Sequence, residues 1–85
     1  MTRVHVGFFM LTWRGPRDAE VEFAGKTVAE LMDHLKERYP GLPDLRREIL
    51  SNRMLALRNG RRIATASQEL VDGDRVIFMD SSYGG

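Results

Sequence analysis

Two stretches of alternating apolar and polar residues open the chain, and both predict β-strands. In residues 4–11 the apolar side chains of one parity predict the face that packs on the core: Val4, Val6, Phe8 and Met10. In residues 18–23 three apolar residues alternate with three carboxylates, which is typical of a half-buried strand. The Gly15-Pro16 pair between them predicts a turn. We therefore expect the two strands to form an antiparallel hairpin.

Helical spacing replaces this alternation after Gly25. From Thr27 onward, one face of the pattern carries the apolar side chains Val28, Leu31, Met32, Leu35 and Tyr39. Thr27 and Glu30 match a capping box, in which each side chain bonds the backbone of the other residue. Pro40-Gly41 ends the helix. The pattern predicts one main amphipathic helix whose apolar stripe packs on the core.

Shorter signals fill the second half of the chain. Asp44 is placed to cap a short helical turn carrying the apolar residues Leu45, Ile49 and Leu50. Residues 54–58 predict a third strand, but both of its faces are largely apolar, so its orientation stays open. Asn59-Gly60 favours the positive φ angles of a type I′ turn and predicts a short return strand over residues 61–64. Residues 75–79 predict the last strand.

These elements follow the order strand, strand, helix, strand, short strand, strand. A hairpin followed by a crossover helix and further strands predicts a mixed sheet with the helix on one face. The expected fold class is therefore α+β, a mixed sheet of four to five strands in the β-grasp arrangement of ubiquitin-like domains. Its first and last strands should lie side by side and parallel. We assign residues 1–80 to this β-grasp domain and residues 81–85 to a flexible C-terminal Gly-Gly tail.

Composition narrows the possible functions. The 85 residues include no cysteine, which excludes disulfides, a thiolate nucleophile and a cysteine-ligated metal. The formal net charge of +1 gives no electrostatic reason to expect a nucleic acid or an anionic membrane as partner. The longest apolar run, residues 8–11, is far too short to span a bilayer. We expect a cytoplasmic protein with no nucleic-acid partner and no membrane partner.

No group of residues predicts an active site inside the domain. His5 and His34 lie on different elements and lack partners at metal-ligand spacing, so no metal site is expected. Asp72 and Asp74 flank a glycine in a turn, and turn chemistry accounts for both. A group of arginines is interpreted as a solvated, salt-bridged face, with a basic patch for an anionic partner as the alternative: Arg46, Arg47, Arg53, Arg58, Arg61 and Arg62.

The tail is the feature on which the functional hypothesis depends. Four residues lead to its last glycine: Ser81, Ser82, Tyr83 and Gly84. The carboxylate of Gly85 has no side chain beside it. An extended segment of six residues reaches roughly 20 Å, far enough to deliver that carboxylate into another protein's narrow active site. A frayed chain end without function is the alternative.

An apolar surface is expected at the root of this tail. If Val76 and Phe78 face the core, Ile77 and Met79 must face outward. Side-by-side first and last strands would bring Phe9 next to both. Apolar side chains gathered on a surface commonly mark a partner interface. We therefore predict a partner interface at Phe9, Ile77 and Met79, with cover by the shorter segments as the alternative.

Six motifs along the chain point to one family. They are Phe8-Phe9, Thr27-Val28-Ala29-Glu30-Leu31, Arg38-Tyr39-Pro40-Gly41-Leu42, Asn59-Gly60, Leu70-Val71-Asp72-Gly73-Asp74-Arg75-Val76 and Gly84-Gly85. In this combination the chain resembles, essentially from end to end, the MoaD/ThiS family of β-grasp sulfur-carrier proteins. Two stretches depart from the family. Met79-Asp80-Ser81 stands where molybdopterin synthase small subunits often carry a Pro-Pro pair, and Trp13 lies in a segment that is usually charged.

The resemblance implies a carrier that is not itself an enzyme and binds no cofactor. A ubiquitin-activating-type adenylyltransferase would adenylate the Gly85 carboxylate and consume ATP. Sulfur from a sulfur donor enzyme would then replace AMP and give a thiocarboxylate. The acceptor synthase large subunit would take the sulfur into molybdopterin, the favoured product, or into thiamine thiazole or another product.

Two alternatives stay open at the level of sequence. One is a ubiquitin-like modifier conjugated through Gly85 to lysines of target proteins, which begins with the same adenylation. The other is a β-grasp interaction module with an inert tail.

Overall fold

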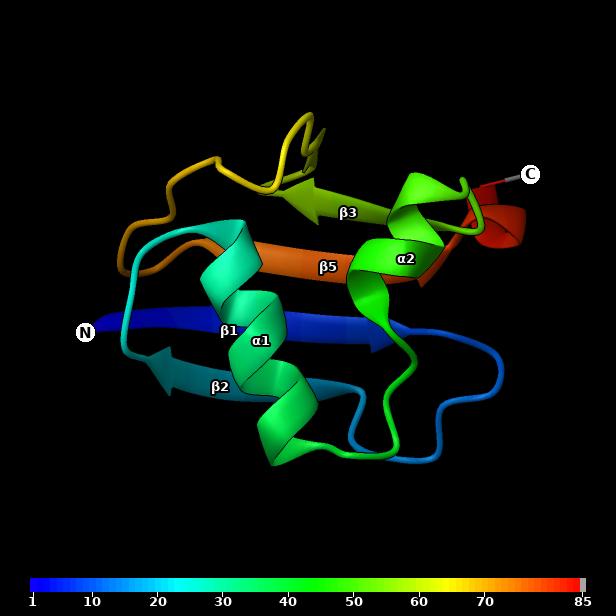
Figure 1. Cartoon of the computed structure of the whole chain (residues 1–85), viewed down its shortest axis with the longest axis horizontal. Coiled ribbons are helices and arrows are strands. Elements are labelled where there is room, and N and C mark those ends of the chain that lie inside the picture. Colours follow the sequence, from blue (N-terminus) through cyan, green and yellow to red (C-terminus); the bar gives the residue numbers. More distant parts are fainter. Residues whose placement is uncertain (85) are drawn as a thin grey trace.

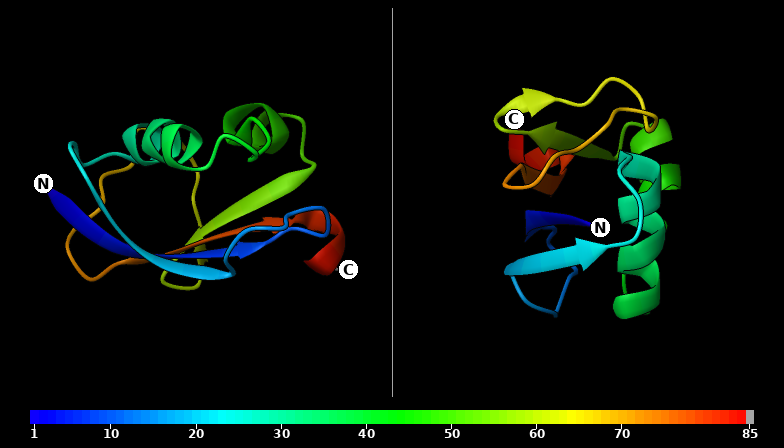
Figure 2. Two further views of the ribbon diagram at one scale, coloured as in Figure 1. Left: turned by 90° about the horizontal axis from the view of Figure 1, so that it is seen from below. Right: turned by 90° about the vertical axis from the view of Figure 1, so that its left-hand side faces the viewer.

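One mixed sheet forms the first layer of the molecule, and two helices lie across one of its faces (Figures 1 and 2). The structure is a computed structural model that describes residues 1–84, without the side chain of Tyr83. The elements are β1 (Thr2–Phe9), β2 (Asp18–Phe23), α1 (Val28–Arg38), α2 (Leu45–Leu50), β3 (Met54–Arg58), β4 (Arg61–Arg62), β5 (Arg75–Asp80) and the 3₁₀ helix η1 (Ser81–Gly84).

The sheet has the strand order β2-β1-β5-β3-β4. The first and last strands, β1 and β5, lie side by side and parallel at its centre, and the other neighbours are antiparallel. Figure 2 shows both helices on the same side, so the opposite face of the sheet stays open. The predicted α+β class and β-grasp arrangement are confirmed.

The core lies between the sheet and the helices, and strand parity explains its composition. The predicted inner face of the first strand is buried at all four positions, Val4, Val6, Phe8 and Met10. Val76 and Phe78 of β5 are fully buried beside them, and α1 contributes Val28, Leu31, Met32 and Leu35 of the predicted stripe. The fifth predicted member, Tyr39, is the C-cap residue of α1 and packs half-buried against the core. Because side chains alternate along a strand, this arrangement leaves the odd-numbered residues of β1 and β5 on the open face.

The ends of α1 are set by the residues that the sequence singled out. Glu30 N donates to Thr27 Oγ1 over 3.2 Å, and Thr27 N donates to Glu30 Oε1 over 3.1 Å, so the predicted capping box is present. At the other end, Lys36 Nζ donates to the carbonyl oxygens of Pro40 and Leu42, which lie beyond the last turn. The charged side chain thereby satisfies carbonyls near the negative end of the helix dipole.

The second half of the chain follows the prediction with one correction. Asp44 caps α2 by accepting from Arg47 N, and Asn59 and Gly60 have φ angles of 50° and 85°, as the predicted type I′ turn requires. The return strand is shorter than predicted, because β4 covers only Arg61–Arg62 and not residues 61–64. After Ile63 donates to Ala56 O, the chain leaves the sheet and crosses to the start of α1.

Asp74 is a buried carboxylate that ties two turns together. It accepts from Arg58 Nε over 2.8 Å, Asn59 Nδ2 over 2.9 Å and Val71 N over 2.8 Å. Burial alone raises the pKa of this carboxyl, but these hydrogen bonds and the charge of Arg58 outweigh it, so the pKa lies below its ordinary value. The predicted role in turn chemistry is therefore fulfilled by a network that also holds the start of β5.

The first residues of the predicted tail form a turn. Residues Ser81–Gly84 form a single 3₁₀ turn directly after β5. Gly85, the residue predicted to be modified, lies outside the described residues. The flexibility predicted for residues 81–85 stays a prediction.

Candidate functional site

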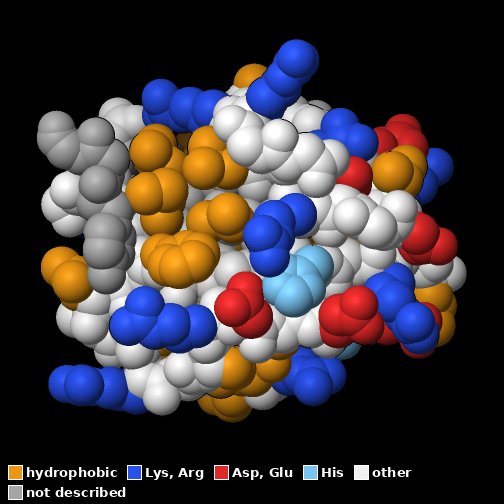
Figure 3. All heavy atoms as spheres, turned by 180° about the vertical axis from the view of Figure 1, so that it is seen from behind, with side chains coloured by type: hydrophobic (Ala, Val, Ile, Leu, Met, Phe, Trp, Pro, Cys, Tyr) orange, Lys and Arg blue, Asp and Glu red, His pale blue; other side chains and the backbone are white. Residues whose placement is uncertain are grey.

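The open face of the sheet carries an apolar surface at the end where β5 leads into η1. In the parallel pair, Phe9 of β1 lies opposite Met79 of β5, and Gly7 lies opposite Ile77. The structure thus brings together Phe9, Ile77 and Met79, the three residues predicted to form an interface. Figure 3 shows apolar side chains gathered on this face of the molecule.

Two further residues of this surface were missed by the sequence prediction. Leu55 of β3 lies opposite Met79, and Leu57 lies opposite Ile77. The signal was present, since residues 54–58 are apolar on both faces, but the sequence could not say which face meets the core. We call the set Phe9, Leu55, Leu57, Ile77 and Met79 the tail-root patch.

Close approach of β1 and β5 shapes the patch around Gly7. A methyl group in place of its hydrogen would lie 3.0 Å from Phe9 Cε2 and 3.4 Å from Ile77 Cγ1. The Phe9 ring therefore lies across Gly7 towards Ile77. All five side chains of the tail-root patch are half-buried, so the patch is less exposed than the sequence suggested. It is a closely packed apolar platform.

The rest of the open face is ionic. His5 Nε2 lies 3.1 Å from Asp18 Oδ1, and Arg3 Nη2 lies 3.4 Å from Glu22 Oε2. These pairs link β1 to the outer strand β2, whose carboxylates all point to this face. The tail-root patch is thus bounded by charged groups on the side away from η1, as is common for the polar rim of a protein interface.

Two hydrogen bonds fix the root of the tail. Leu11 N donates to Asp80 Oδ2 over 2.7 Å, and Ser81 N donates to Arg53 O over 3.1 Å. The first bond joins the last residue of β5 to the loop after β1, and the second extends the ladder with β3. The direction in which the chain leaves the sheet is therefore set on both sides of β5.

The loop between β1 and β2 packs on the same end of the molecule. Trp13 forms an aromatic triangle with Phe8 and Tyr39, with ring centroids 5.7 to 5.8 Å apart. Its Nε1 donates to Pro16 O over 2.8 Å, which closes the loop on itself. The segment that departs from the family in sequence is thus an ordered part of the tail-bearing end.

The arginines and His34 remain from the candidates that the sequence offered. Arg58 pairs with Asp74, and Arg53 pairs with Glu48 over 2.7 Å and lowers the pKa of that carboxyl. Two of the six arginines named from the sequence are therefore held in ion pairs. His34 lies half-buried near Phe23, with ring centroids 6.4 Å apart.

Within residues 1–84, no three histidine, aspartate or glutamate side chains gather closely enough to hold a metal ion. In the same part of the chain, no helix has the length and apolarity that a bilayer crossing requires.

Comparison with known proteins places the chain among ubiquitin-like proteins. The model of the ThiS family matches residues 12–85. The crystal structure of SAMP1 from Haloferax volcanii is similar with a TM-score of 0.70 and 22% identity, over 98% of this chain and 99% of that chain. The ubiquitin-like domain of an Arabidopsis thaliana protein, solved by NMR, is similar with a TM-score of 0.51 and 17% identity. That match covers 100% of this chain and 84% of the Arabidopsis domain. No curated protein matches.

At these identities the two solved structures support the fold alone. The family match is independent of them and covers the helices, the tail-root patch except Phe9, and the Gly-Gly residues.

Proposed function

The chain belongs to the ThiS family of ubiquitin-like carrier and modifier proteins, and from that premise we propose that Gly85 is the residue it uses. In the proposed reaction the Gly85 carboxylate is adenylated by a partner enzyme and then converted to a thiocarboxylate that donates sulfur in cofactor biosynthesis. Small carriers of this kind are generally not catalytic themselves. Molybdopterin is the first product to test, followed by thiamine thiazole.

The tail-root patch is the observation that supports this proposal best. It places Phe9, Ile77 and Met79 on one platform directly before η1. A partner that docks on the platform would receive the residues after β5 at a fixed distance and direction. A carrier needs this coupling, because the reacting carboxylate must reach a site that belongs to another protein.

The chemistry requires little from the carrier. Attack of the carboxylate on the α-phosphate of ATP forms the acyl-adenylate and releases pyrophosphate, which converts a poor electrophile into a reactive one. A sulfide-level nucleophile from the sulfur donor enzyme then attacks the acyl carbon, so that a C–S bond forms as the C–O bond to AMP breaks, and loss of a proton leaves the thiocarboxylate. Glycine at the last two positions keeps the segment slim, since neither residue brings a side chain into a confined site.

The apolar tail-root patch and its ionic border indicate which partners to expect. The patch is apolar with an ionic border, which suits an adenylyltransferase of the ubiquitin-activating type that buries the platform. The same surface would later meet the synthase subunit that accepts the sulfur. A sulfur donor enzyme completes the set, and we place all of these steps in the cytoplasm.

Reconstitution with the cognate adenylyltransferase tests the proposal. The full chain, ATP and the partner should give the acyl-adenylate, detected as an AMP-sized mass increase on the fragment that contains Gly85. Removal of Gly85 should abolish the product. A Ser82→Ala variant serves as the matched control, because it changes the same short segment and leaves the two glycines in place. If the fragment that contains Gly85 stays unmodified although the partner binds both the full chain and ATP, the proposal is wrong.

A further inference from the structure

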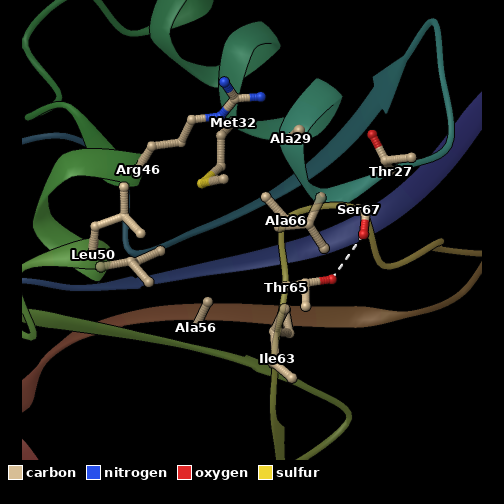
Figure 4. Close-up of a pocket in the computed structure, with 13 residues that line it drawn as sticks. Thr27, Ala29, Met32, Arg46, Leu50, Ala56, Ile63, Thr65, Ala66 and Ser67 are labelled. Atoms are coloured by element: carbon tan, nitrogen blue, oxygen red, sulfur yellow. Dashed lines mark hydrogen bonds between the residues drawn. The ribbon is translucent and has the colours of Figure 1, made fainter.

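A groove on the helix side of the molecule takes no part in the proposed function. It lies between α1, α2 and the segment of residues 63–67 that follows β4, and it measures about 690 Å³. Figure 4 shows Met32 of α1, Leu50 of α2, Ala56 of β3 and Ile63 around the same space. Because both helices cover one face of the sheet, the groove and the tail-root patch lie on opposite sides of the molecule.

The lining of the groove is apolar. Its larger side chains are Met32, Ile49, Leu50 and Ile63, with alanines between them. The Leu50 residue at the mouth is 85% exposed. Leu50 and the groove together form a continuous apolar surface, and exposing such a surface to water is unfavourable.

The wall formed by residues 63–67 is held at both ends. Ile63 N donates to Ala56 O over 2.8 Å, which ties the segment to β3. Ala29 N donates to Ala66 O over 2.8 Å, which ties it to the first turn of α1. Within the same segment, Thr65 and Ser67 share a hydrogen bond through their hydroxyl groups. The groove is thus present before any partner binds, and little ordering is needed to fill it.

Among the described residues, arginine supplies the charge in the groove itself and in one adjoining hollow, whereas Asp33 and Asp44 line further hollows that share Arg46 with the groove. Of the residues that the structure describes, Arg46 of α2 is the only charged one that lines the groove, and its side chain extends towards Met32 (Figure 4). Arg62 lines an adjoining hollow that shares Leu50 and Ile63 with the groove. Among the described residues, no carboxylate lines either hollow, and neither arginine forms an ion pair.

We propose that this groove is a docking site for an acidic segment of a partner protein that presents leucine-sized side chains next to carboxylates. The apolar side chains would fill the space beside Leu50, and the carboxylates would pair with Arg46 and Arg62. A second copy of the chain fits less well, because a symmetric contact would bring the arginines of both copies together. If the proposed function holds, the groove allows a second protein to hold the carrier while the opposite face serves the tail.

A titration of the full-length, ¹⁵N-labelled chain with a synthetic peptide of alternating glutamate and leucine tests the proposal. Saturable shifts are expected at Ala29, Arg46, Leu50 and Ala66, while the amides of Ile77 and Met79 stay in place. Two matched peptides, one with alanine for leucine and one with lysine for glutamate, should not saturate. Binding of the alanine peptide with equal affinity would overturn the proposal, as would shifts centred on the tail-root patch.

Variants of the chain make the test independent of the peptide design. Leu50→Glu and Arg46→Glu should each weaken binding by about tenfold or more, because each removes one of the two recognised features. Val71→Glu is the matched control, since Val71 is also an exposed apolar residue, at 58%, but lies outside the groove. Circular dichroism confirms that each variant is folded.

Sedimentation of the free chain supplies the remaining outcome. A dimer that Leu50→Glu dissolves would assign the groove to a second copy and contradict the proposal. None of these measurements uses Gly85, so a negative result here leaves the sulfur chemistry unaffected, and a failed adenylation leaves the groove unaffected.

Discussion

Among single residues, Asp74 shows how one side chain can serve several parts of the fold. Its carboxylate joins the turn before β5 to the type I′ turn after β3 through Val71, Asn59 and Arg58. The sequence identified Asp74 as a turn residue because Asp-Gly-Asp is a turn pattern. It could not show the partners at Asn59 and Arg58, which are distant along the chain and meet Asp74 only in the folded sheet.

Replacement of Asp74 by asparagine should destabilise the protein most at neutral pH. The amide cannot accept all of the donors that the carboxylate accepts, and the free energy of unfolding should fall by about 2–4 kcal/mol. Because the pKa of Asp74 is lowered, its contribution is complete above the ordinary value of 3.8 and is lost as pH falls through the folded-state pKa. Urea denaturation of both proteins at pH 7 and below pH 3 measures this difference.

The two unfolding free energies should converge at the acidic end. A difference that stays constant down to the lowest pH would show that the loss comes from packing alone.

Gly7 is the second residue whose role appears only in the structure. In Gly7→Ala the new methyl group should displace the Phe9 ring from its position next to Ile77 and lower the free energy of unfolding by about 1 kcal/mol. Nuclear Overhauser contacts between the Phe9 ring and Ile77 report the displacement. Gly41→Ala is the matched control, because its methyl group would meet only Trp13, at 3.8 Å. Unchanged contacts in Gly7→Ala would mean that the ring does not depend on this glycine.

Most features of the helices and strands could be predicted from the local sequence pattern. The strand parity of β1, the capping box of α1 and the turn at Asn59-Gly60 were predicted correctly, because each depends on neighbouring residues. The orientation of β3 and the length of β4 were not, because both depend on contacts made after the chain returns to the sheet. For the same reason Leu55 and Leu57 were missing from the predicted interface.

A substitution in β5 tests whether the tail-root patch is the docking surface. Ile77→Glu places a charge in the centre of the tail-root patch while Val76 and Phe78 keep the inner face intact. Affinity for the cognate adenylyltransferase should fall by about tenfold or more, since a desolvated charge without a partner opposes burial of the patch. Calorimetric titration measures it. Glu20→Lys, also a charge change on the open face but on the ionic strand β2, should change affinity by less than about threefold.

An unchanged affinity would contradict the proposed role of the tail-root patch. If Ile77→Glu binds the partner as the unaltered chain does, the platform beside η1 is not the docking surface.

On the scale of the whole molecule, the core and the proposed reactive residue are separate. The core lies between the sheet and the helices, and its last member along the chain is Phe78. Removal of Gly85 should therefore leave the free energy of unfolding within about 0.5 kcal/mol of the unaltered chain, measured by urea denaturation. A larger loss would show that the last residue is part of the fold and would weaken its assignment as a free carrier group.

The mass of the intact chain, isolated from its own cells, shows whether Gly85 carries sulfur. We expect a population heavier by about 16 Da, the difference between a carboxylate and a thiocarboxylate, with the change confined to Gly85. A chain found only with its unmodified carboxylate while its pathway is active would contradict the account. A chain found only as conjugates to the lysines of other proteins would also contradict it, because the molecule would then be a modifier and not a sulfur carrier.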